Sequence, residues 1–437
     1  MEKKVTIAAA GDALILNRMP DYPGREELTA FLRQSDVSLV NLETTLTDGT
    51  LCGAARSGGT WLTSRPEVAR DLQELGFDLL AVGNNHTHDY GEEGVRQTVW
   101  NLRNMGIAHC GAGCTLYEAA RPEILETPHS RVAVLQVCST CHEEDIAGRQ
   151  SESMPGRPGL APLRFTTEYT VNAGHMQALR EIAAGTYMNG WRAFGQQQGY
   201  VPEDAPGTFS FGDLRFVQGE PEGKHTRACP EDLRRTREMI QSALLQAEYC
   251  VVMVHSHEIP RDQNDEPEEF LMEFAHACIE AGACAVVGSG THELKGIEIY
   301  RGKPIFYCLG NFVFQNNFVE RLPADYMEEK GLPLTLTGGQ AFSEVGKRAR
   351  CSLQQNRSSY QTVVPRFSFS GEKLTEIRML PVSLQPEERM TYATWPAPAG
   401  EEESREICRT LARLSAPFGT KMEWKEDGCI YIQLKEE

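Results

Sequence analysis

The sequence contains no apolar run long enough to span a bilayer as a helix, which takes about 20 residues. Two lysines near the N-terminus precede a short apolar run, but Asp12 ends that run too early for a signal peptide. The thirteen cysteines, an odd number scattered through apolar segments, are typical of reduced core thiols. We therefore expect a cytoplasmic protein without a membrane span.

Basic residues are also fewer than acidic residues in this sequence. The chain has 43 Lys and Arg residues against 61 Asp and Glu residues, so its formal net charge is −18 at pH 7. Nucleic acids and anionic lipids both require clustered basic side chains, and we expect neither as a partner. An anionic substrate, either a small molecule or a polymer, would need a bound cation to supply the missing positive charge.

The sequence shows no internal repeat, no clean linker and no zinc-finger spacing of cysteines. The apolar fraction of 41% is enough for a sizeable core. Short apolar runs alternate with amphipathic stretches, which favours βαβ units and a layered α/β domain. Strands are expected at residues 5–10, 37–40, 79–82, 131–137, 249–254 and 284–287, and helices at 66–75, 94–105, 233–247 and 268–280.

Two regions depart from this alternation. Residues 143–208 are rich in Gly, Pro and polar side chains and are expected to form a long excursion over the site, with a helix near 172–184. Near the C-terminus, residues 361–370 and 374–380 alternate like paired strands, residues 401–414 favour a helix, and Asp427-Gly428 marks a hairpin. We expect one domain over residues 1–385, including the insertion, with a helix and hairpin over 386–437 packed on it.

Side chains that can bind a metal follow five of the apolar runs. These residues are Asp12, Glu43, Asn85 with His86, His255 with His257, and His292. Strand ends meet at one edge of an α/β sheet, so we expect these side chains to lie together. The mixture of carboxylates, an amide oxygen and imidazoles suits zinc, manganese or iron(II). Taken singly, each residue has a structural alternative as a helix cap, a turn residue or a packed core histidine.

Several short motifs occur in a fixed order between about residues 7 and 314. They are Gly11-Asp12, Asn41-Leu42-Glu43, Asn84-Asn85-His86 with Asp89-Tyr90-Gly91, Pro158-Gly159-Leu160, His255-Ser256-His257-Glu258, Gly288 to His292, Gly296 to Tyr300, and Gly302 to Phe312. This series resembles the CapA/PgsA-type poly-γ-glutamate capsule proteins, whose fold is that of the calcineurin-like metallophosphoesterases. The last block, which ends in Leu309-Gly310-Asn311-Phe312, is the most specific.

The resemblance implies a four-layer α-β-β-α sandwich, in which two stacked mixed sheets are flanked by helices. It also implies one or two divalent ions (Mn, Zn or Fe) where the strand ends meet. By this resemblance, Asp12 and His292 hold one ion. Asn85 and His255 hold the other, and Glu43 lies between the two.

The same resemblance assigns roles to residues around the metals. His86 would protonate a leaving group or hold a phosphoryl oxygen, Asp89 would fix its ring, and His257 is a reserve ligand. Two positions depart from the family pattern. Leu14 stands where metallophosphoesterases usually have a histidine, and Ser289 stands where capsule proteins commonly have one. One ligand of the second metal is therefore expected to be missing or replaced, with His257 or His88 as candidates.

Three functions are compatible with these residues. The first is a metal-dependent hydrolase of phosphoester or related type. The second is a non-catalytic or assembly role in making poly-γ-glutamate or another envelope polymer. The third is a binding protein with a degenerate metal site, which Leu14 and Ser289 suggest. Capsule-type relatives generally carry an N-terminal membrane anchor, and its absence here favours the hydrolase.

Overall fold

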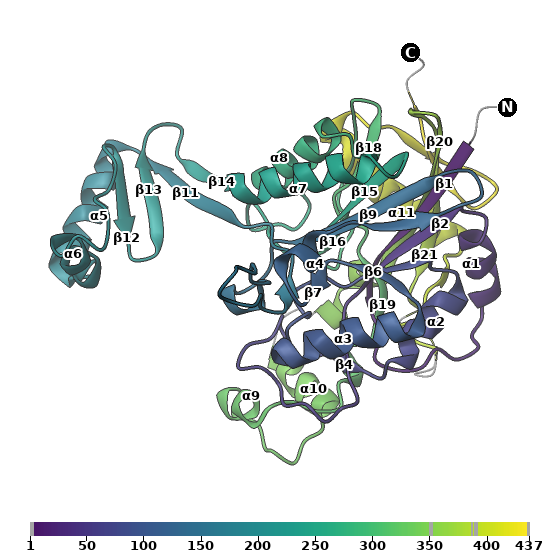
Figure 1. Ribbon diagram of the computed structural model, residues 1–437, viewed down its shortest axis with the longest axis horizontal. Coiled ribbons are helices and arrows are strands. Elements are labelled where there is room, and N and C mark those ends of the chain that lie inside the picture. The colour runs from purple at the N-terminus through teal and green to yellow at the C-terminus, as the bar shows by residue number, and fades with distance from the viewer. Residues whose placement is uncertain (1–3, 349–352, 386–387, 389–391, 435–437) are drawn as a thin grey trace.

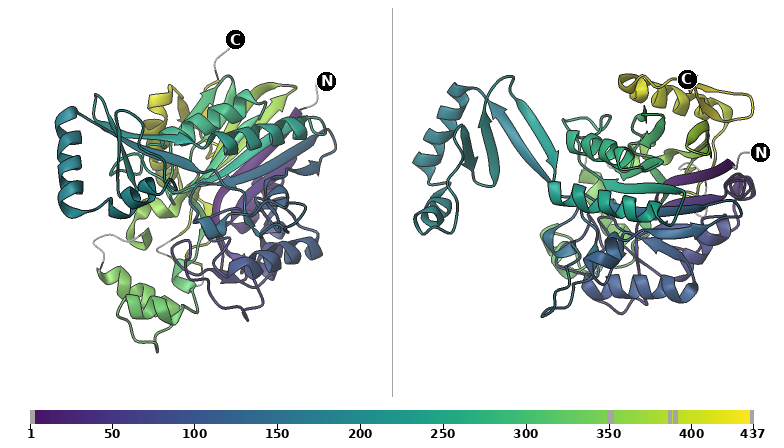
Figure 2. Two further views of the ribbon diagram at one scale, coloured as in Figure 1. Left: turned by 60° about the vertical axis from the view of Figure 1, so that its left-hand side comes forward. Right: turned by 45° about the horizontal axis from the view of Figure 1, so that its top comes forward.

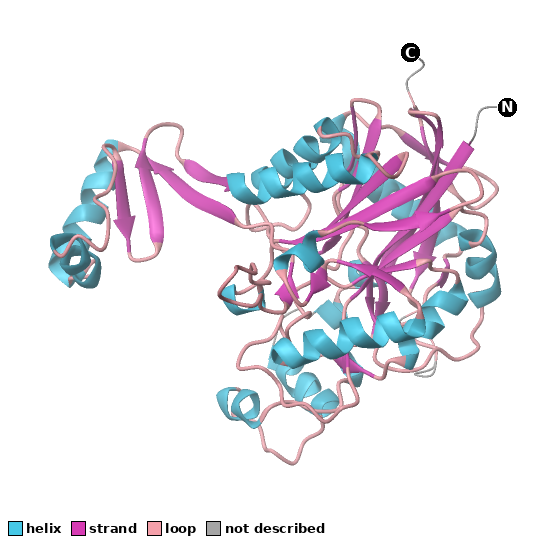
Figure 3. Ribbon diagram, in the orientation of Figure 1, coloured by secondary structure: helices cyan, strands magenta, loops and turns pink. Residues whose placement is uncertain are grey.

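The computed structural model describes residues 4–348, 353–385, 388 and 392–434, and it shows a mixed α/β protein (Figures 1 and 3). The alternation of strands and helices expected from the sequence is confirmed along the chain. Most of the expected elements are present with ends shifted by a few residues, and two large sheets contain the strands that carry the predicted ligands.

The larger sheet has ten strands in the order β23-β24-β21-β20-β1-β2-β5-β6, with β19 beside β1 and β22 beside β21. Strands β1, β2, β5 and β6 are parallel to one another, whereas β20 runs antiparallel to β1. The strands are β1 Lys4–Leu14, β2 Val37–Leu42, β5 Leu79–Ala81, β6 Ala108–Cys110, β19 Asn311–Phe314, β20 Gln361–Ser370, β21 Lys373–Ser383, β22 Ala397–Pro398, β23 Met422–Trp424 and β24 Ile430–Ile432.

The smaller sheet has six strands in the order β17-β18-β16-β15-β9-β8. Its central strands β9, β15 and β16 are parallel, and β17 and β18 form an antiparallel hairpin at one edge. The strands are β8 Glu123–Glu126, β9 Arg131–Cys138, β15 Tyr249–Ser256, β16 Ala285–Gly290, β17 Ile297–Tyr300 and β18 Lys303–Phe306.

Three hydrophobic clusters arrange these sheets and the helices in layers (Figure 2). Successive side chains of a strand point to opposite faces of its sheet. In β1, Ala8 therefore packs with α1 (Arg25–Leu32), α2 (Glu67–Leu75) and α3 (Gly91–Met105), while Ile7 packs between the sheets. On the far side of the six-stranded sheet, the third cluster joins α4 (Leu116–Ala120), α7 (Pro230–Leu244) and α8 (Glu269–Glu280) to the strands. Helices therefore cover both outer faces.

Two strands run further into the site than the sequence suggests. β1 continues past Asp12 to Leu14, with register irregularities on both sides of Asp12, and β15 includes His255. Both side chains are polar but fully buried. The apolar run in the sequence therefore ends before each of them, whereas the strand continues past it. Irregular strand pairing of this kind is common beside active sites, where it redirects a side chain.

An arm extends from the body between β10 (Gly159–Leu160) and α7 (Figures 1 and 2). It consists of β11 Phe165–Val171, α5 Ala173–Thr186, α6 Gly190–Gln197, β12 Thr208–Phe211, β13 Leu214–Gln218 and β14 Gly223–Ala228. The helix expected near 172–184 is confirmed as α5. The four strands form their own sheet, and the arm projects away from the two large sheets instead of lying over them.

The C-terminal residues add strands to the ten-stranded sheet. The expected strand pair is confirmed as β20 and β21, and β22 and β24 both pair with β21. Helix α11 (Glu401–Ser415) and the hairpin of β23 and β24 match the sequence prediction, and Ile407 and Leu411 pack in the cluster between the sheets. Residues 386–387, 389–391 and 435–437 of the predicted segment lie outside the described residues.

Smaller elements complete the fold. The short strands β3 Thr45–Leu46 and β4 Thr63–Ser64 pair with each other, as do β7 Ala112–Gly113 and β10 Gly159–Leu160. Helices α9 (Ala324–Glu329) and α10 (Gly338–Arg348) share a small cluster of their own. Among the residues that the structure describes, no helix has both the length and the apolarity needed to cross a membrane. The twelve cysteines in this part of the chain are free thiols.

Close contact between two backbones holds β1 in place beside the site. A Cβ atom added at Gly11 would lie 1.9 Å from the carbonyl oxygen of Gly310. We expect Gly11→Ala to lower the free energy of unfolding by about 1–3 kcal/mol or more, because backbone and not a flexible side chain must move. Gly185→Ala in α5, where the added Cβ meets nothing within 4 Å, is the matched control. Thermal denaturation of both variants checks this, and equal midpoints would contradict it.

Candidate metal centre

Three side chains from separate strand ends meet between the two large sheets. Glu43 follows β2, His257 follows β15 and His292 follows β16, and each offers a ligand atom within 4.8 Å of the other two. Glu43 and His292 are buried, and His257 is partly buried. One carboxylate and two imidazoles form the mixed oxygen and nitrogen set that zinc, manganese and iron(II) accept.

The carboxylate of Glu43 is fully buried, and neither of its oxygens has a hydrogen-bond partner. The ring nitrogens His255 Nε2 and His86 Nε2 lie 3.8 and 3.9 Å from its Oε1 atom. Burial, together with the nearby charges of Asp12 and Asp89, raises the pKa of Glu43 well above its usual value. An unpaired buried carboxylate is costly, and a bound cation removes that cost. The residues therefore fit a divalent ion.

The two imidazoles of this cluster are held in the form that binds metals. Burial lowers the pKa of His257 well below its usual value, and the neighbouring imidazoles of His255 and His292 add to the effect. Burial also lowers the pKa of His292, despite the opposing charge of Asp12. A neutral imidazole keeps a free lone pair, which is the form that coordinates a cation.

The ring of His292 is oriented by Asn311 of β19. Asn311 donates its amide N–H to the carbonyl oxygen of Ser359 at 2.8 Å, so its Oδ1 atom is the acceptor for His292 Nδ1, also at 2.8 Å. This leaves His292 Nε2 without a proton. The backbone of His292 has a φ of 60°, in the left-handed region that few side chains adopt. Such strain is concentrated at functional sites.

Asn85 and His255 lie beside the three-residue cluster. His255 Nε2 is 2.8 Å from Asn85 Oδ1 and 3.1 Å from His257 Nε2. The amide nitrogen of Asn85 donates to the carbonyl oxygen of Gly58 at 2.7 Å, which turns its oxygen toward His255. The structure therefore brings the predicted ligands Asn85, His255 and His257 together, with their ligand atoms in contact.

Asp12 belongs to the same polar cluster but is engaged differently. Asn41 donates to its Oδ1 atom at 2.7 Å, and the backbone N–H of Gly290 donates to its Oδ2 atom at 2.8 Å. It lies 3.4 Å from His255 Nδ1, on the other nitrogen of the ring from Asn85. Burial alone would raise the pKa of Asp12, but His255 and His292 bring it below the usual value. Asp12 is not one of the three residues with ligand atoms within 4.8 Å.

His86 is held beside Glu43 by Asp89. The Nδ1 atom of His86 is 2.7 Å from Asp89 Oδ2. Asp89 also accepts backbone N–H bonds from Gly58 at 3.0 Å and from Leu62 at 2.7 Å, so its carboxylate is fixed by the loop before β4. Since Nδ1 faces a carboxylate, it carries the proton, and Nε2 is left facing Glu43 at 3.9 Å.

Three buried amides to which the sequence analysis assigns no role, Asn41, Asn84 and Gln136, connect this site to both sheets. Gln136 of β9 donates to Asn41 Oδ1 at 2.8 Å and accepts the backbone N–H of Gly83 at 2.6 Å. Asn84 donates to Asn41 Oδ1 at 3.2 Å and to a backbone carbonyl of β2. The sequence signal for Asn41 and Gln136 is a single amide inside an otherwise apolar strand, since buried polar groups need partners.

The two departures from the family pattern have different surroundings. Leu14 is buried in the apolar cluster under α1 to α3, and its aliphatic side chain has no atom that can bind a metal. Ser289 lies 3.0 Å from His255 Nδ1 through its hydroxyl oxygen. Of the two candidate replacement ligands, His257 is in the cluster, whereas His88 Nδ1 lies 3.3 Å from Asp145 Oδ1.

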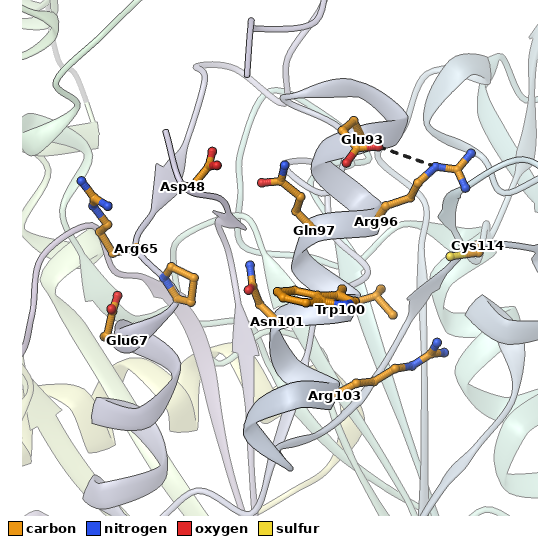
Figure 4. Close-up of a pocket in the computed structure, with 12 residues that line it drawn as sticks. Asp48, Arg65, Glu67, Glu93, Arg96, Gln97, Trp100, Asn101, Arg103 and Cys114 are labelled. Carbon is orange, nitrogen blue, oxygen red and sulfur yellow. Dashed lines mark ion pairs between the residues drawn. The ribbon is translucent and has the colours of Figure 1, made fainter. Parts of the chain in front are cut away.

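A separate pocket of about 580 Å³ opens on the outer side of α3 around Trp100 (Figure 4). Its lining includes Arg65, Glu67, Glu93, Arg96 and Arg103 and none of the predicted ligands. The side chains around Trp100 carry charges of both signs, and Figure 4 shows the ion pair of Arg96 with Glu93 among them. This pocket therefore lies apart from the candidate metal centre.

The layered α/β fold and the buried carboxylate–imidazole cluster define a class of proteins with a candidate metal centre at the strand ends. Residues 6–316 match the family described as Bacterial capsule synthesis protein PGA_cap, and the chain belongs to this family.

The chain is also similar to individual proteins. It is 30% identical over 431 residues to the uncharacterised protein y4sH of Sinorhizobium fredii, covering 95% of this chain and 90% of that protein. It is 24% identical over 258 residues to the PGA biosynthesis protein CapA of Bacillus subtilis, covering 59% of this chain and 48% of that protein. It is 26% identical over 280 residues to a probable polyglutamine synthesis accessory protein of Mycobacterium tuberculosis, covering 64% of this chain and 56% of that protein.

The position of His257 leads to a test of the ligand set. We expect His257→Ala to weaken manganese or zinc binding by more than about tenfold, because one of three ligand atoms is lost. His88→Ala is the matched control, since His88 is a buried histidine of the neighbouring loop that faces Asp145. Titration calorimetry on both variants measures the difference. Equal affinities in His257→Ala and wild type would remove His257 from the ligand set.

The unpaired carboxylate of Glu43 leads to a test by pH. Its folded pKa is raised, so in metal-free protein the stability that it contributes is present below the usual value of 4.5 and is lost as pH rises through the folded pKa. Glu43→Gln does not titrate. The metal-free variant should therefore lose less stability than wild type as the pH rises above the usual value of 4.5.

The exposed residue Glu152 gives the control for this test as Glu152→Gln. Denaturation midpoints in a chelator, and again with manganese, measure both effects. Added manganese should stabilise wild type and Glu152→Gln but not Glu43→Gln. If the denaturation midpoint of Glu43→Gln depended on pH as that of wild type does, Glu43 would not be the group that titrates.

Proposed function

We propose that this protein is a metal-dependent hydrolase of phosphoester or related anionic substrates. The observation that carries the proposal is the unpartnered carboxylate of Glu43, which faces two neutral imidazoles while His86 is held beside it by Asp89. A cation-binding group next to an oriented acid–base residue is the arrangement that metal-assisted hydrolysis requires.

The layers of the fold support this proposal. Helices pack on both outer faces of two sheets that share an inner cluster, in the order expected for a four-layer metallophosphoesterase sandwich. The side chains of the candidate site come from the carboxyl ends of the central parallel strands, which is where α/β proteins keep their sites. We take the fold to be of this type.

In the proposed enzyme, Glu43, His257 and His292 would hold one divalent ion, manganese, zinc or iron. Asn85 and His255 would complete its surroundings or hold a second ion. The chemistry that a divalent ion supplies in such a site is activation of water and stabilisation of charge on a phosphoryl oxygen. It would also offset the acidity of a chain whose net charge is −18.

The residues of the chain would perform the remaining steps. Asp89 holds the Nδ1 proton of His86, so the imidazolium form of His86 can donate its Nε2 proton to the leaving oxygen. Lys295 is buried and donates to the carbonyl oxygens of Glu258 and Glu266. It thereby fixes the loop that follows His257. Burial of these groups keeps bulk water away from the reacting atoms.

A second candidate function is a non-catalytic role in assembling a capsule polymer. The printed names of the relatives from Bacillus subtilis and Mycobacterium tuberculosis favour it, because they refer to PGA biosynthesis and polyglutamine synthesis. In this role, the same cation centre would bind an anionic polymer without cleaving it.

A panel of phosphomonoesters, phosphodiesters and γ-glutamyl peptides, assayed with added manganese or zinc, tests the proposal. Hydrolysis that depends on the metal supports the enzyme. Protein that binds the ion but cleaves nothing favours polymer assembly, and folded protein that binds no ion favours the degenerate binding protein.

The placement of His86 gives a sharper prediction for any substrate that the panel finds. We expect His86→Ala to lower kcat by about 100-fold or more while the metal content stays the same, because His86 moves a proton but is not one of the three clustered ligands. The exposed residue His129 provides the control as His129→Ala. Unchanged turnover in His86→Ala would remove His86 from this role.

A further inference from the structure

The ring of His257 is held differently from that of its fellow ligand His292. Asn311 bonds to the Nδ1 atom of His292 at 2.8 Å, which is the usual way to orient a metal-binding histidine. In the described part of the chain, no group forms a hydrogen bond to the Nδ1 atom of His257. Its ring centroid lies 5.0 Å from that of His255 and 5.1 Å from that of His292. The position of this ring therefore depends on how its backbone is anchored.

The backbone of His257 is anchored by Thr140, which lies in the loop that follows β9. The pairing of β9 with β15 ends at Cys138 and His255, so the backbone N–H of His257 lies beyond the strand ladder. Thr140 Oγ1 accepts a hydrogen bond from this N–H at 2.8 Å. Buried and partly buried backbone groups need such a partner. A side-chain oxygen thus replaces the sheet at the residue that carries a candidate metal ligand.

The carboxylate of Glu258 fixes the direction of the Thr140 hydroxyl. Thr140 Oγ1 donates to Glu258 Oε1 at 2.9 Å. The hydroxyls of Ser139 and Ser256 donate to Glu258 Oε2 at 2.6 and 2.8 Å. A hydroxyl has one proton and two lone pairs, so donation to the carboxylate leaves Thr140 free to accept the N–H of His257. Three hydroxyls and one carboxylate therefore join the ends of β9 and β15 beside this ligand.

The two residues after His257 are held by lysines. Lys295 donates to the carbonyl oxygen of Glu258 at 3.4 Å, and Lys224 of β14 donates to that of Ile259 at 2.9 Å. These bonds fix the chain that leaves the ligand. Among the described residues, Thr140 alone forms a hydrogen bond with the backbone N–H of His257 itself. The contact that acts most directly on the position of this ligand is therefore that of Thr140.

We propose that Thr140 is a positioning residue of the metal centre, whose hydroxyl holds His257 where its imidazole nitrogen meets the ligand atoms of Glu43 and His292. This inference rests on the proposed metal-dependent function, because it requires the cluster to bind a cation. Metal–ligand distances vary by only about 0.2 Å around their preferred values. A small displacement of the His257 backbone is therefore enough to weaken binding.

A cobalt(II) titration of the full chain tests this role, because the visible absorption of Co²⁺ depends on the number and arrangement of its ligands. Thr140→Val keeps the shape of the side chain but removes the hydroxyl. We expect it to lower the affinity for Co²⁺ about tenfold or more and to change the visible spectrum. Thr140→Ser keeps a hydroxyl and should restore both. The control is Thr236→Val in α7, where a buried threonine donates to the carbonyl oxygen of Asp232 at 2.9 Å.

The outcomes separate this inference from the proposed function. Thr236→Val should keep the wild-type affinity and spectrum even where thermal denaturation shows a loss of stability. Wild-type affinity and spectrum in Thr140→Val would overturn the role of Thr140, and so would a failure of Thr140→Ser to restore them. Wild-type protein that binds neither Co²⁺ nor Mn²⁺ would overturn the metal centre and this inference together. Protein that binds Co²⁺ but hydrolyses nothing would contradict the hydrolase and leave the role of Thr140 standing.

Discussion

The buried carboxylate of Glu43 is the constraint on which the rest of the site depends. A charged group without water or hydrogen bonds is unfavourable inside a protein, so its surroundings must either neutralise it or supply a cation. The groups nearest to it are imidazoles, not arginine or lysine. The chain thus leaves a carboxyl group without a partner in its centre, between two sheets whose other facing side chains are mostly apolar.

Hydrogen bonds that cross between the sheets keep this centre in shape. Gln136 of the six-stranded sheet bonds to Asn41 of the ten-stranded sheet, and Asn41 in turn bonds to Asp12. His255 connects to Asn85 across the same boundary. One sheet can slide over the other only if these hydrogen bonds break and leave their buried polar groups unpaired. The polar network therefore fixes the position of one sheet relative to the other across an otherwise apolar interface.

Much of the fold could be predicted from the sequence, because the central strands of both sheets and the helices α2, α3, α7 and α8 have a clear apolar pattern. The sequence prediction is incomplete where a polar group is buried: it ends two strands before Asp12 and His255, and it assigns no role to Asn41 or Gln136. The arm was expected to lie over the site, because composition indicates an excursion but not its direction. Which ligand atoms meet, as for Glu43 with His257, depends on distances that no spacing along the chain encodes.

The roots of the arm have an evolutionary consequence. Phe165 and Ala228, at its two ends, are paired across β11 and β14, so the chain leaves the body and returns to it at nearly the same place. An insertion with adjacent ends can lengthen, shrink or disappear without moving the strands on either side. In evolution, a chain with this layout can gain, lose or replace the arm as a module without displacing the strands that carry the candidate metal centre.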